Sequence, residues 1–181
     1  MNQARQIHNL ALVGFMGTGK SSVGHLVAGI LHFEFVDTDD LIEARAGKRI
    51  VDLFAQEGEA RFRELERHIV AEISHFRKTV IATGGGLVVN PANMASLKTH
   101  ALVVCLWASP EIIWERVRHQ THRPLLHGPE PLEKIRRLLA EREPFYREAD
   151  VLLNTEMRSV KEVAHQAAHQ FRAAWGPPAL H

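Results

Sequence analysis

The chain carries, near its start, Gly14-Phe15-Met16-Gly17-Thr18-Gly19-Lys20-Ser21, a complete G-x-x-x-x-G-K-[ST] phosphate-binding loop. An apolar run that suits a buried strand, Leu10–Val13, precedes the loop, and a segment with helical spacing, Ser22–His32, follows it. A strand, a glycine loop and a helix in this order aim backbone N–H groups and the positive end of the helix dipole at a polyphosphate. The sequence therefore predicts a protein that binds a nucleoside triphosphate.

Two side chains of this loop are candidates for chemistry as well as for binding. Lys20 can reach the β- and γ-phosphates, which makes it a candidate catalytic residue, and the Ser21 hydroxyl can ligate Mg²⁺. We expect ATP to be held by residues of the loop and by the position after it, namely Gly14, Gly17, Thr18, Gly19, Lys20, Ser21 and Ser22.

Short apolar runs alternate along the chain with longer segments of helical spacing. The strand-like runs are Leu10–Val13, Phe33–Val36, Thr79–Ala82, Ala101–Leu106 and Val151–Leu153. The helical segments are Lys20–His32, Glu57–Phe76, Pro110–Arg118, Pro131–Glu148 and Ser159–Trp175. Continuous apolar strands that alternate with helices are typical of an α/β protein whose parallel sheet is covered on both faces. Such sheets bind ligands beyond the carboxyl ends of their strands, so the residues after each strand are candidates for a site.

Acidic residues follow the second predicted strand, in the order Asp37-Thr38-Asp39-Asp40. Many phosphate-loop enzymes hold Mg²⁺ with a carboxylate after a second core strand, but the third predicted strand ends in glycines instead. We therefore expect Asp37 to support Mg²⁺ together with Ser21, directly or through water. Asp39 is expected slightly farther out, where it can hold an acceptor hydroxyl as a catalytic residue. Asp40 is the best candidate for the N-cap of the helix that follows.

Three glycines in a row, Gly84-Gly85-Gly86, follow the third predicted strand. A plain turn needs one or two glycines, so a run of three favours a functional role. Bare backbone lets a small ligand approach closely, with N–H groups available to an anion or a hydroxyl. The phosphate loop, the carboxylates and the glycine run are therefore expected to meet at one edge of the sheet.

A long segment without apolar periodicity spans about residues 119–131 and contains three prolines and one glycine. Long loops in compact domains are often lids that close over a site. Seven basic residues against three acidic ones lie between Arg116 and Arg142, so this region carries excess positive charge. Arg123, beside the rigid Pro124, is the candidate for a catalytic arginine that neutralises charge on a transferring phosphoryl group.

Composition and charge describe one domain, residues 1–181, with 45% hydrophobic residues and a formal net charge of +1. Neither the charge nor any apolar run points to a nucleic acid or a membrane, and we expect a monomer that acts on small molecules. The first eight residues lack the apolar core of a signal peptide. The single cysteine, Cys105, lies in an apolar run and favours a buried thiol in a reducing cytoplasm. The twelve histidines are scattered and fit solvated side chains better than a metal site.

Taken together, these motifs resemble those of the shikimate kinase family. The matching pieces run in the family's order over about residues 8 to 172: the phosphate loop, Asp37-Thr38-Asp39, Phe62-Arg63 with Glu66, Gly84-Gly85-Gly86, Arg123-Pro124-Leu125-Leu126, and Arg142 with Pro144 and Tyr146. The phosphate loop is shared by many kinases, whereas the Asp-x-Asp pair, the triple glycine and Arg-Pro-Leu-Leu together are far more specific.

The resemblance of these residues implies a three-layer phosphate-loop fold with a five-stranded parallel sheet in the order 2-3-1-4-5 and a mobile lid. It also implies ATP-dependent phosphorylation of the shikimate 3-hydroxyl, with Mg²⁺ as the cofactor. This reaction is a step of the chorismate pathway to the aromatic amino acids.

By position, the resemblance gives roles to residues around a shikimate pocket. Asp39 would hold the acceptor hydroxyls, and Arg63 and Arg142 would grip the carboxylate. The pocket would be lined by the glycine run, Gly84, Gly85 and Gly86. Arg63 and Arg142 rest mainly on the resemblance, because the helical segment around Arg63 otherwise fits a solvated, salt-bridged face.

The nucleotide side of the site would use two further arginines. By resemblance, Arg123 would be the lid arginine near the phosphates, and Arg116 would lie beside the adenine. One departure concerns the segment after the last predicted strand, where the family often has an aspartate and this chain reads Leu152-Leu153-Asn154-Thr155. Recognition of the base is therefore expected to differ in detail.

Two other functions fit part of the sequence. A kinase for another small polyol acid, such as gluconate, can use the same scaffold, although the triple glycine and the arginine pair favour shikimate. A nucleotide switch or a catalytically silent ATP-binding module is the alternative from a different class. The guanine and switch motifs Asn-Lys-x-Asp and Asp-x-x-Gly do not occur in the chain. A silent module is expected to have lost Lys20, Asp37 or Asp39, and all three are present.

Overall fold

The computed structural model describes residues 5–119 and 130–175. Its centre is a parallel five-stranded sheet with the strand order β2-β3-β1-β4-β5. The strands are β1 (Asn9–Val13), β2 (Glu34–Asp37), β3 (Thr79–Ala82), β4 (Ala101–Trp107) and β5 (Val151–Asn154). Both the parallel sheet and the strand order agree with the sequence-based expectation.

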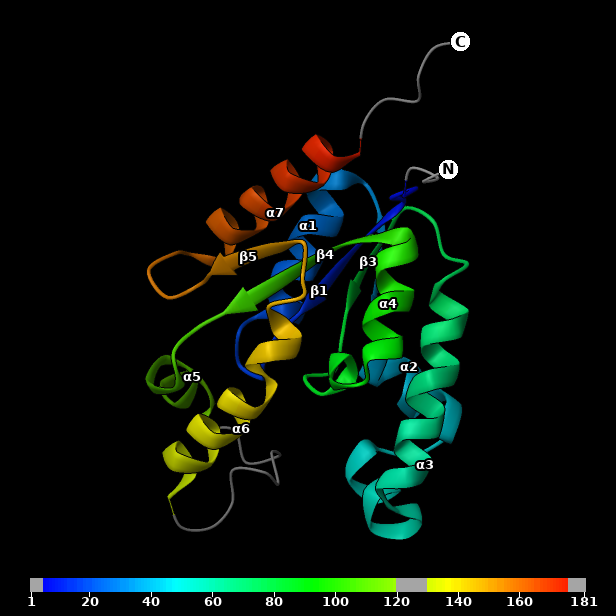
Figure 1. Ribbon diagram of the computed structural model, residues 1–181, viewed down its shortest axis with the longest axis vertical. Coiled ribbons are helices and arrows are strands. Elements are labelled where there is room, and N and C mark those ends of the chain that lie inside the picture. Colours follow the sequence, from blue (N-terminus) through cyan, green and yellow to red (C-terminus); the bar gives the residue numbers. More distant parts are fainter. Residues whose placement is uncertain (1–4, 120–129, 176–181) are drawn as a thin grey trace.

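Helices cover both faces of this sheet (Figure 1). Helices α1 (Lys20–Leu31) and α7 (Val160–Ala174) lie together on one face. The other face and the edge beyond the strand ends carry α2 (Thr38–Ala46), α3 (Ile50–Ile73), the 3₁₀ turn η1 (Leu87–Val89), α4 (Pro91–His100), α5 (Pro110–Val117) and α6 (Pro131–Tyr146). The arrangement is the three-layer architecture that alternating strands and helices predict.

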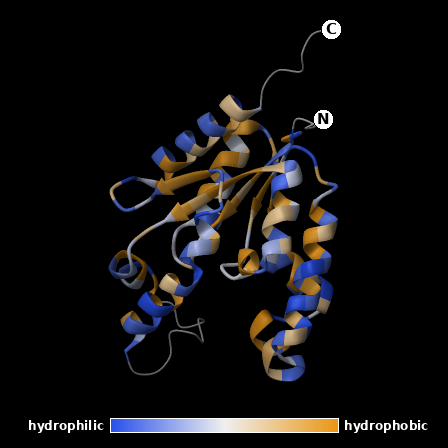
Figure 2. Ribbon diagram, in the orientation of Figure 1, coloured by the Kyte–Doolittle hydropathy of each residue, from blue (hydrophilic) through white to orange (hydrophobic). Residues whose placement is uncertain are grey.

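Strand β1 shows how the sheet divides the hydrophobic core. Leu10 and Leu12 pack in the cluster that contains Phe171 of α7, whereas Ala11 and Val13 pack in the cluster on the opposite face. All five residues of β1 are buried, which explains why the strand reads as a continuous apolar run. Figure 2 shows the same pattern, with apolar strands inside and hydrophilic residues on the outer surfaces of the helices.

Three helical elements differ from the expectation. Helix α4 was not predicted, because its buried apolar residues Met94 and Leu97 are interleaved with the buried polar residues Asn93 and His100. Helix α3 begins at Ile50 rather than at residue 57, and a non-helical residue, Gly58, with φ 80° and ψ 174°, kinks it. Helix α2 begins directly after β2, so Asp39 and Asp40 lie in its first turn.

A buried polar cluster ties the amino ends of the strands together. Asn9 Nδ2 donates to the Phe76 carbonyl at 2.7 Å and lies 3.0 Å from His100 Nδ1, while Asn9 Oδ1 accepts from the Thr79 N–H at 3.1 Å. Burial, followed by the charge of Arg77, lowers the pKa of His100 to about 4. The expectation of solvated histidines is therefore wrong for His100, which is a neutral core residue.

Cys105 lies in the middle of β4 and is fully buried, as the sequence predicts. Burial raises the pKa of its thiol to about 12. Within residues 5–119 and 130–175, no helix combines the length and the apolar character that crossing a membrane requires.

Candidate active site

The phosphate loop turns from the end of β1 into the start of α1. Lys20 is the first residue of α1, and its Nζ donates to the carbonyls of Gly14 and Phe15, both at 2.9 Å. Thr18 Oγ1 also donates to the Phe15 carbonyl, at 2.8 Å. The first turn of α1 carries no acidic residue, so the positive end of this helix remains available to an anion.

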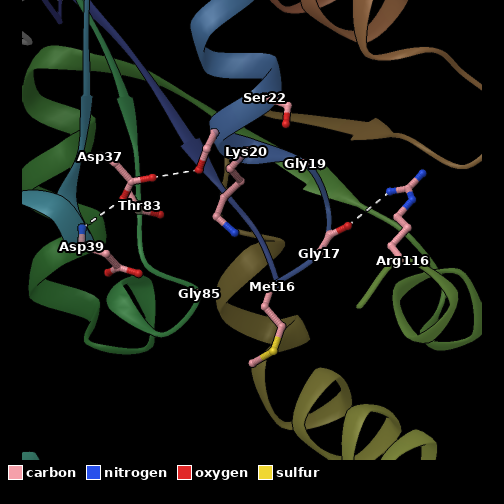
Figure 3. Close-up of a pocket in the computed structure, with 11 residues that line it drawn as sticks. Met16, Gly17, Gly19, Lys20, Ser22, Asp37, Asp39, Thr83, Gly85 and Arg116 are labelled. Carbon is pink, nitrogen blue, oxygen red and sulfur yellow. Dashed lines mark hydrogen bonds between the residues drawn. The ribbon is translucent and has the colours of Figure 1, made fainter. Parts of the chain in front are cut away.

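A pocket of about 380 Å³ opens beside this loop (Figure 3). The side chains of Lys20, Asp37 and Asp39 point toward its interior from α1, the end of β2 and the start of α2. The described residues that line it are Met16, Gly17, Gly19, Lys20, Ser21, Ser22, Asp37, Asp39, Thr83, Gly85 and Arg116. The strand ends thus deliver the phosphate loop, the carboxylates and the glycine run to one space.

The Asp37 carboxylate joins the phosphate loop to α2. Its Oδ2 accepts from the Ser21 hydroxyl at 2.8 Å, and its Oδ1 accepts from the Asp39 N–H at 3.0 Å. Asp37, and not Asp40, is therefore the N-cap of α2. The expectation for Asp40 was wrong because α2 begins three residues earlier than a start near position 41 requires.

Ser21 and Asp37 offer a hydroxyl and a carboxylate oxygen side by side at the pocket wall. Hard oxygen ligands of this kind suit Mg²⁺, which typically takes one or two protein ligands and completes its octahedron with water and phosphate oxygens. The part of the chain that the structure describes holds no group of three histidine, cysteine or acidic residues arranged for a metal. The two oxygen ligands of Ser21 and Asp37 fit a Mg²⁺ ion that completes its coordination with water or phosphate oxygens.

Asp39 is the most strongly perturbed carboxylate of the pocket. Burial and then the neighbouring charge of Asp37 raise its pKa to about 6, although Lys20 acts in the opposite direction. Gly84 gives this carboxylate room, because a Cβ at Gly84 would lie only 2.5 Å from Asp39 Oδ1. A buried carboxylate with a raised pKa at the mouth of a phosphate site is suited to hold a hydroxyl group.

Side-chain hydrogen bonds hold the first and the middle residue of the glycine run. The Gly84 N–H donates to Thr38 Oγ1 at 2.9 Å, so it serves the fold and not a ligand, contrary to the general expectation for this run. The Gly85 carbonyl accepts from Tyr146 Oη at 2.6 Å and from Arg142 Nη1 at 3.3 Å. Gly85 thus lies between the pocket on one side and α6 on the other.

Arg63, Glu66 and Arg142 form a charged group behind the glycine run. Arg63 Nη1 pairs with Glu66 Oε2 at 2.9 Å, and Gly86 borders it closely, since a Cβ there would lie 3.2 Å from Nη1. Burial raises the pKa of Glu66, while Arg63 and Arg142 both act to lower it. Arg63 also pairs with Glu59, which is exposed, at 3.1 Å. Planar guanidinium groups of this kind suit a carboxylate ligand, because they can offer it two parallel N–H donors.

These two arginines adjoin the pocket without lining it. Among the described residues, the pocket wall includes Gly85 but neither Arg63 nor Arg142. Arg142 lies over the Phe15 ring at 5.6 Å and contacts the pocket through Gly85. The predicted site residues thus lie in two adjoining parts, the pocket beside the phosphate loop and the charged group behind the glycine run.

Arg116 closes the opposite side of the phosphate loop. It donates to Thr155 Oγ1 at 2.9 Å and to the Thr155 carbonyl at 2.6 Å. It also donates to the Gly17 carbonyl at 3.5 Å (Figure 3). A smaller hollow of about 160 Å³ extends from here toward the start of α7, where Arg158 and Val160 line it. Its planar arginine and apolar wall fit the base of a nucleotide.

Sequence reasoning gave no individual role to Thr38, Tyr146, Thr155 or Arg158. The partners of Thr38, Tyr146 and Thr155 are remote in the chain, so no local spacing reveals them. The one available signal was that Tyr146 follows Arg142 by one helical turn. Arg123 and most of the expected lid, about residues 119–131, lie outside the described residues.

Comparison with known proteins gives a consistent result. A family model described as shikimate kinase matches residues 16–172. The chain is 44% identical over 163 residues to the shikimate kinase of Caldanaerobacter subterraneus, which covers 90% of this chain and 95% of that one. It is also 44% identical over 163 residues to the shikimate kinase of Thermodesulfovibrio yellowstonii, with 90% and 94% covered.

Solved structures agree with these relatives. The shikimate kinase from Acinetobacter baumannii in complex with shikimate matches with a TM-score of 0.87 and 35% identity, over 93% of this chain and 95% of that one. A gluconokinase from Sinorhizobium meliloti matches with a TM-score of 0.59 over 93% of this chain and 94% of that one, but at 18% identity this likeness shows the fold alone.

Proposed function

The chain belongs to the shikimate kinase family, and from this we propose that it transfers the γ-phosphoryl group of ATP to the 3-hydroxyl of shikimate. The products are shikimate 3-phosphate and ADP, in the pathway to chorismate and the aromatic amino acids. The observation that carries the proposal is the convergence of Lys20 and Asp39 on one pocket, next to the paired guanidinium groups of Arg63 and Arg142.

We assign the phosphate side of the reaction to the loop between β1 and α1. Backbone N–H groups of the loop and the Lys20 ammonium bind the β- and γ-phosphates and stabilise the charge that develops during transfer. Ser21 and Asp37 are proposed to hold Mg²⁺, which supplies charge neutralisation at the phosphates when it is bound. The direct Ser21–Asp37 hydrogen bond at 2.8 Å supports this pairing.

On the acceptor side, Asp39 orients the 3-hydroxyl toward the γ-phosphate and accepts its proton as the new P–O bond forms. Phosphoryl transfer depends more on positioning and charge stabilisation than on a strong base, so a carboxylate suffices. Arg63 and Arg142 hold the shikimate carboxylate through forked, charge-assisted hydrogen bonds. Because they carry no side chains, Gly84, Gly85 and Gly86 leave room for the shikimate ring between Asp39 and the two arginines.

The remaining assignments stay proposals. Arg116, between the phosphate loop and Thr155, is proposed to lie beside the adenine. Arg123 is proposed from the sequence as the arginine that reaches the phosphates. We further propose a single catalytic domain over residues 1–181, which acts as a cytoplasmic monomer on small molecules and not on nucleic acid.

The reaction is tested by coupled ADP release with Mg²⁺, ATP and either shikimate or gluconate. We expect shikimate-dependent turnover that gluconate does not support, and we expect Lys20→Ala to abolish it. ADP release with gluconate but not with shikimate would assign the scaffold to another polyol acid. Tight ATP binding without turnover on either acid would instead favour a silent nucleotide-binding module.

A further inference from the structure

The Gly85 carbonyl is shared by two side chains of α6. Tyr146 Oη donates to it at 2.6 Å, and Arg142 Nη1 donates to it at the longer distance of 3.3 Å. The two residues are four positions apart on the helix, so they lie on the same face one turn from each other. Gly85 itself lines the pocket that contains Lys20 and Asp39.

The two donors differ in what else they can do. Tyr146 is 2% exposed, and burial raises the pKa of its phenol to about 12, so its hydroxyl remains a donor at every working pH. Arg142 presents five N–H donors, and the proposed function requires them for the substrate carboxylate. When Arg142 turns toward a ligand, Tyr146 is the group that keeps the partly buried Gly85 carbonyl hydrogen-bonded.

A second buried hydroxyl holds the same loop from the opposite element. Thr38 Oγ1, at the start of α2, accepts from the Gly84 N–H at 2.9 Å, and Thr38 is fully buried. Three consecutive glycines have no side chains with which to fix their own backbone, and their conformational freedom is the largest of any residue. Backbone hydrogen bonds from the Leu87 and Val89 N–H groups to the Gly84 and Gly86 carbonyls, both at 3.1 Å, hold the loop to the turn that follows it. The two side-chain hydroxyls tie it to α2 and α6.

These two hydroxyl contacts bear directly on the acceptor site. A peptide group is planar and trans, so fixing the direction of the Gly85 C=O also fixes the Gly86 N–H, which points the opposite way. Gly86 lies against the Arg63 guanidinium, and Gly84 lies against the Asp39 carboxylate. A rotation of either peptide would therefore change the space between the two groups proposed to hold shikimate.

We propose that the hydroxyls of Tyr146 and Thr38 are positioning residues for the acceptor substrate. They hold the Gly84–Gly86 backbone in the one conformation that leaves Asp39, Arg63 and Arg142 free to bind shikimate together. This inference rests on the proposed function, and it adds two residues that touch neither substrate.

The test compares Michaelis constants for both substrates in single-hydroxyl variants. Tyr146→Phe and Thr38→Val are each expected to raise KM for shikimate about tenfold, while KM for ATP stays within about twofold of wild type. Thr38→Ser keeps the acceptor oxygen and is expected to restore wild-type KM values. Thr99→Val, at an exposed hydroxyl on α4, is the matched control and is expected to leave both constants unchanged.

Unchanged KM for shikimate in both variants would overturn the proposal, and so would an equal rise of both KM values, which a general loss of packing would cause. If Tyr146→Phe fails to fold, as circular dichroism would reveal, the comparison of Thr38→Val with Thr38→Ser decides. Failure of the proposed function is a separate result, because wild-type protein would then release no ADP with shikimate.

Discussion

At the scale of single residues, the carboxylates of the pocket combine several tasks in few atoms. Asp37 caps α2 with one oxygen and accepts from Ser21 with the other. Asp39 is held nearby in a setting that penalises its charge. A carboxyl group whose pKa is raised on folding reduces the free energy of unfolding at neutral pH, so Asp39 is retained at a cost of up to about 3 kcal/mol.

The first prediction concerns this cost and the pH dependence of Asp39. Its folded pKa of about 6 lies above the model-peptide value of 3.8, so the destabilisation grows as pH rises from 3.8 through 6. Asp39→Asn is therefore expected to raise the melting temperature at pH 7, to leave it unchanged near pH 3, and to abolish turnover. Calorimetry at the two pH values measures the difference.

Removal of the Asp37 charge tests the cause of the raised pKa. Asp37→Asn is expected to lower the pKa of Asp39 only part of the way, because burial is the larger cause. The ¹³C shift of the Asp39 carboxyl, followed against pH in the protein without ligands, reports this directly. An unchanged titration midpoint would contradict the assignment of Asp37 as a contributor.

A second prediction compares two arginines on α3. Arg63 pairs with the buried Glu66, whereas Arg61 pairs with the exposed Glu64. Arg63→Ala is expected to raise KM for shikimate at least tenfold and to leave KM for ATP nearly unchanged, because a charge-assisted contact contributes about 1.5–3 kcal/mol. Arg61→Ala is the matched control, and equal effects of the two substitutions in the ADP-release assay would refute the role of Arg63.

Residues of the site differ in how far the sequence could reveal them. Lys20, Ser21 and Asp37 follow from the phosphate loop and from the end of the next strand, where local order sets position. Thr38 and Tyr146 could not be found in this way, because their hydrogen bonds reach the glycine run across 46 and 61 residues of chain. Such partners are fixed by tertiary packing alone.

At the scale of secondary-structure elements, α1 couples the phosphate loop to the sheet through close packing. Gly24 of α1 lies against Phe35 of β2, and a Cβ at Gly24 would meet the Phe35 ring at 2.5 Å. The ring also contacts the His25 ring, with 3.8 Å between the centroids and 37° between the planes, so a shift of Phe35 has to displace His25 as well. Gly29 of the same helix has open space around it.

The third prediction follows from this difference. Gly24→Ala is expected to destabilise the protein by about 1–3 kcal/mol through overpacking. Gly29→Ala is expected to stabilise it by roughly 0.5–1 kcal/mol, because alanine loses less backbone entropy in a helix. Urea unfolding of the two variants measures both values, and destabilisation by both alike would show that helix packing is not the cause.

The elements that the sequence failed to predict share a physical reason. The sequence of helix α4 has little regular hydrophobic periodicity, because the polar residues Asn93 and His100 are buried beside its apolar residues. Its start was nevertheless marked by Asn90, whose side chain accepts from the Ala92 N–H, and by Pro91 in the first turn. Hydrophobic period identifies a helix only where tertiary structure buries one apolar face.

At the scale of the whole molecule, the two ends of the parallel strands carry different kinds of interaction. The carboxyl ends carry the charged site, whereas the amino ends carry the neutral cluster of Asn9 and His100. The alternating pattern predicted a parallel sheet, whereas the order of its strands came from the family resemblance alone. The cluster of Asn9 and His100 at the amino ends could not be predicted, because a single histidine in a polar segment has the same sequence pattern as a solvent-exposed histidine.

The fourth prediction concerns acid stability. The pKa of His100 falls from 6.5 in the unfolded chain to about 4 in the fold, so the unfolded state binds more protons between these values. Stability is therefore expected to fall by up to about 3 kcal/mol as pH drops from 6.5 to 4, and to change no further through this group below pH 4. Chemical unfolding at several pH values measures this window.

Two histidine variants separate this contribution from those of other groups. His100→Gln removes the titration, so its stability is expected to depend less on pH than that of the wild type. His169→Gln, at an exposed position on α7, is expected to retain the wild-type dependence. Identical pH profiles for His100→Gln and the wild type would show that another group sets the acid limit.

The position of Cys105 in β4 has a practical consequence. Since the chain contains one cysteine and its thiol is shielded by the packed sheet, alkylating reagents can reach it only when the sheet opens. The rate at which Cys105 is alkylated therefore measures how often the central strands open, and no engineered label is needed. A nucleotide that binds only the closed protein should lower the alkylation rate by the factor 1 + [L]/Kd. A thiol assay can therefore rank the affinities of ligands without following turnover.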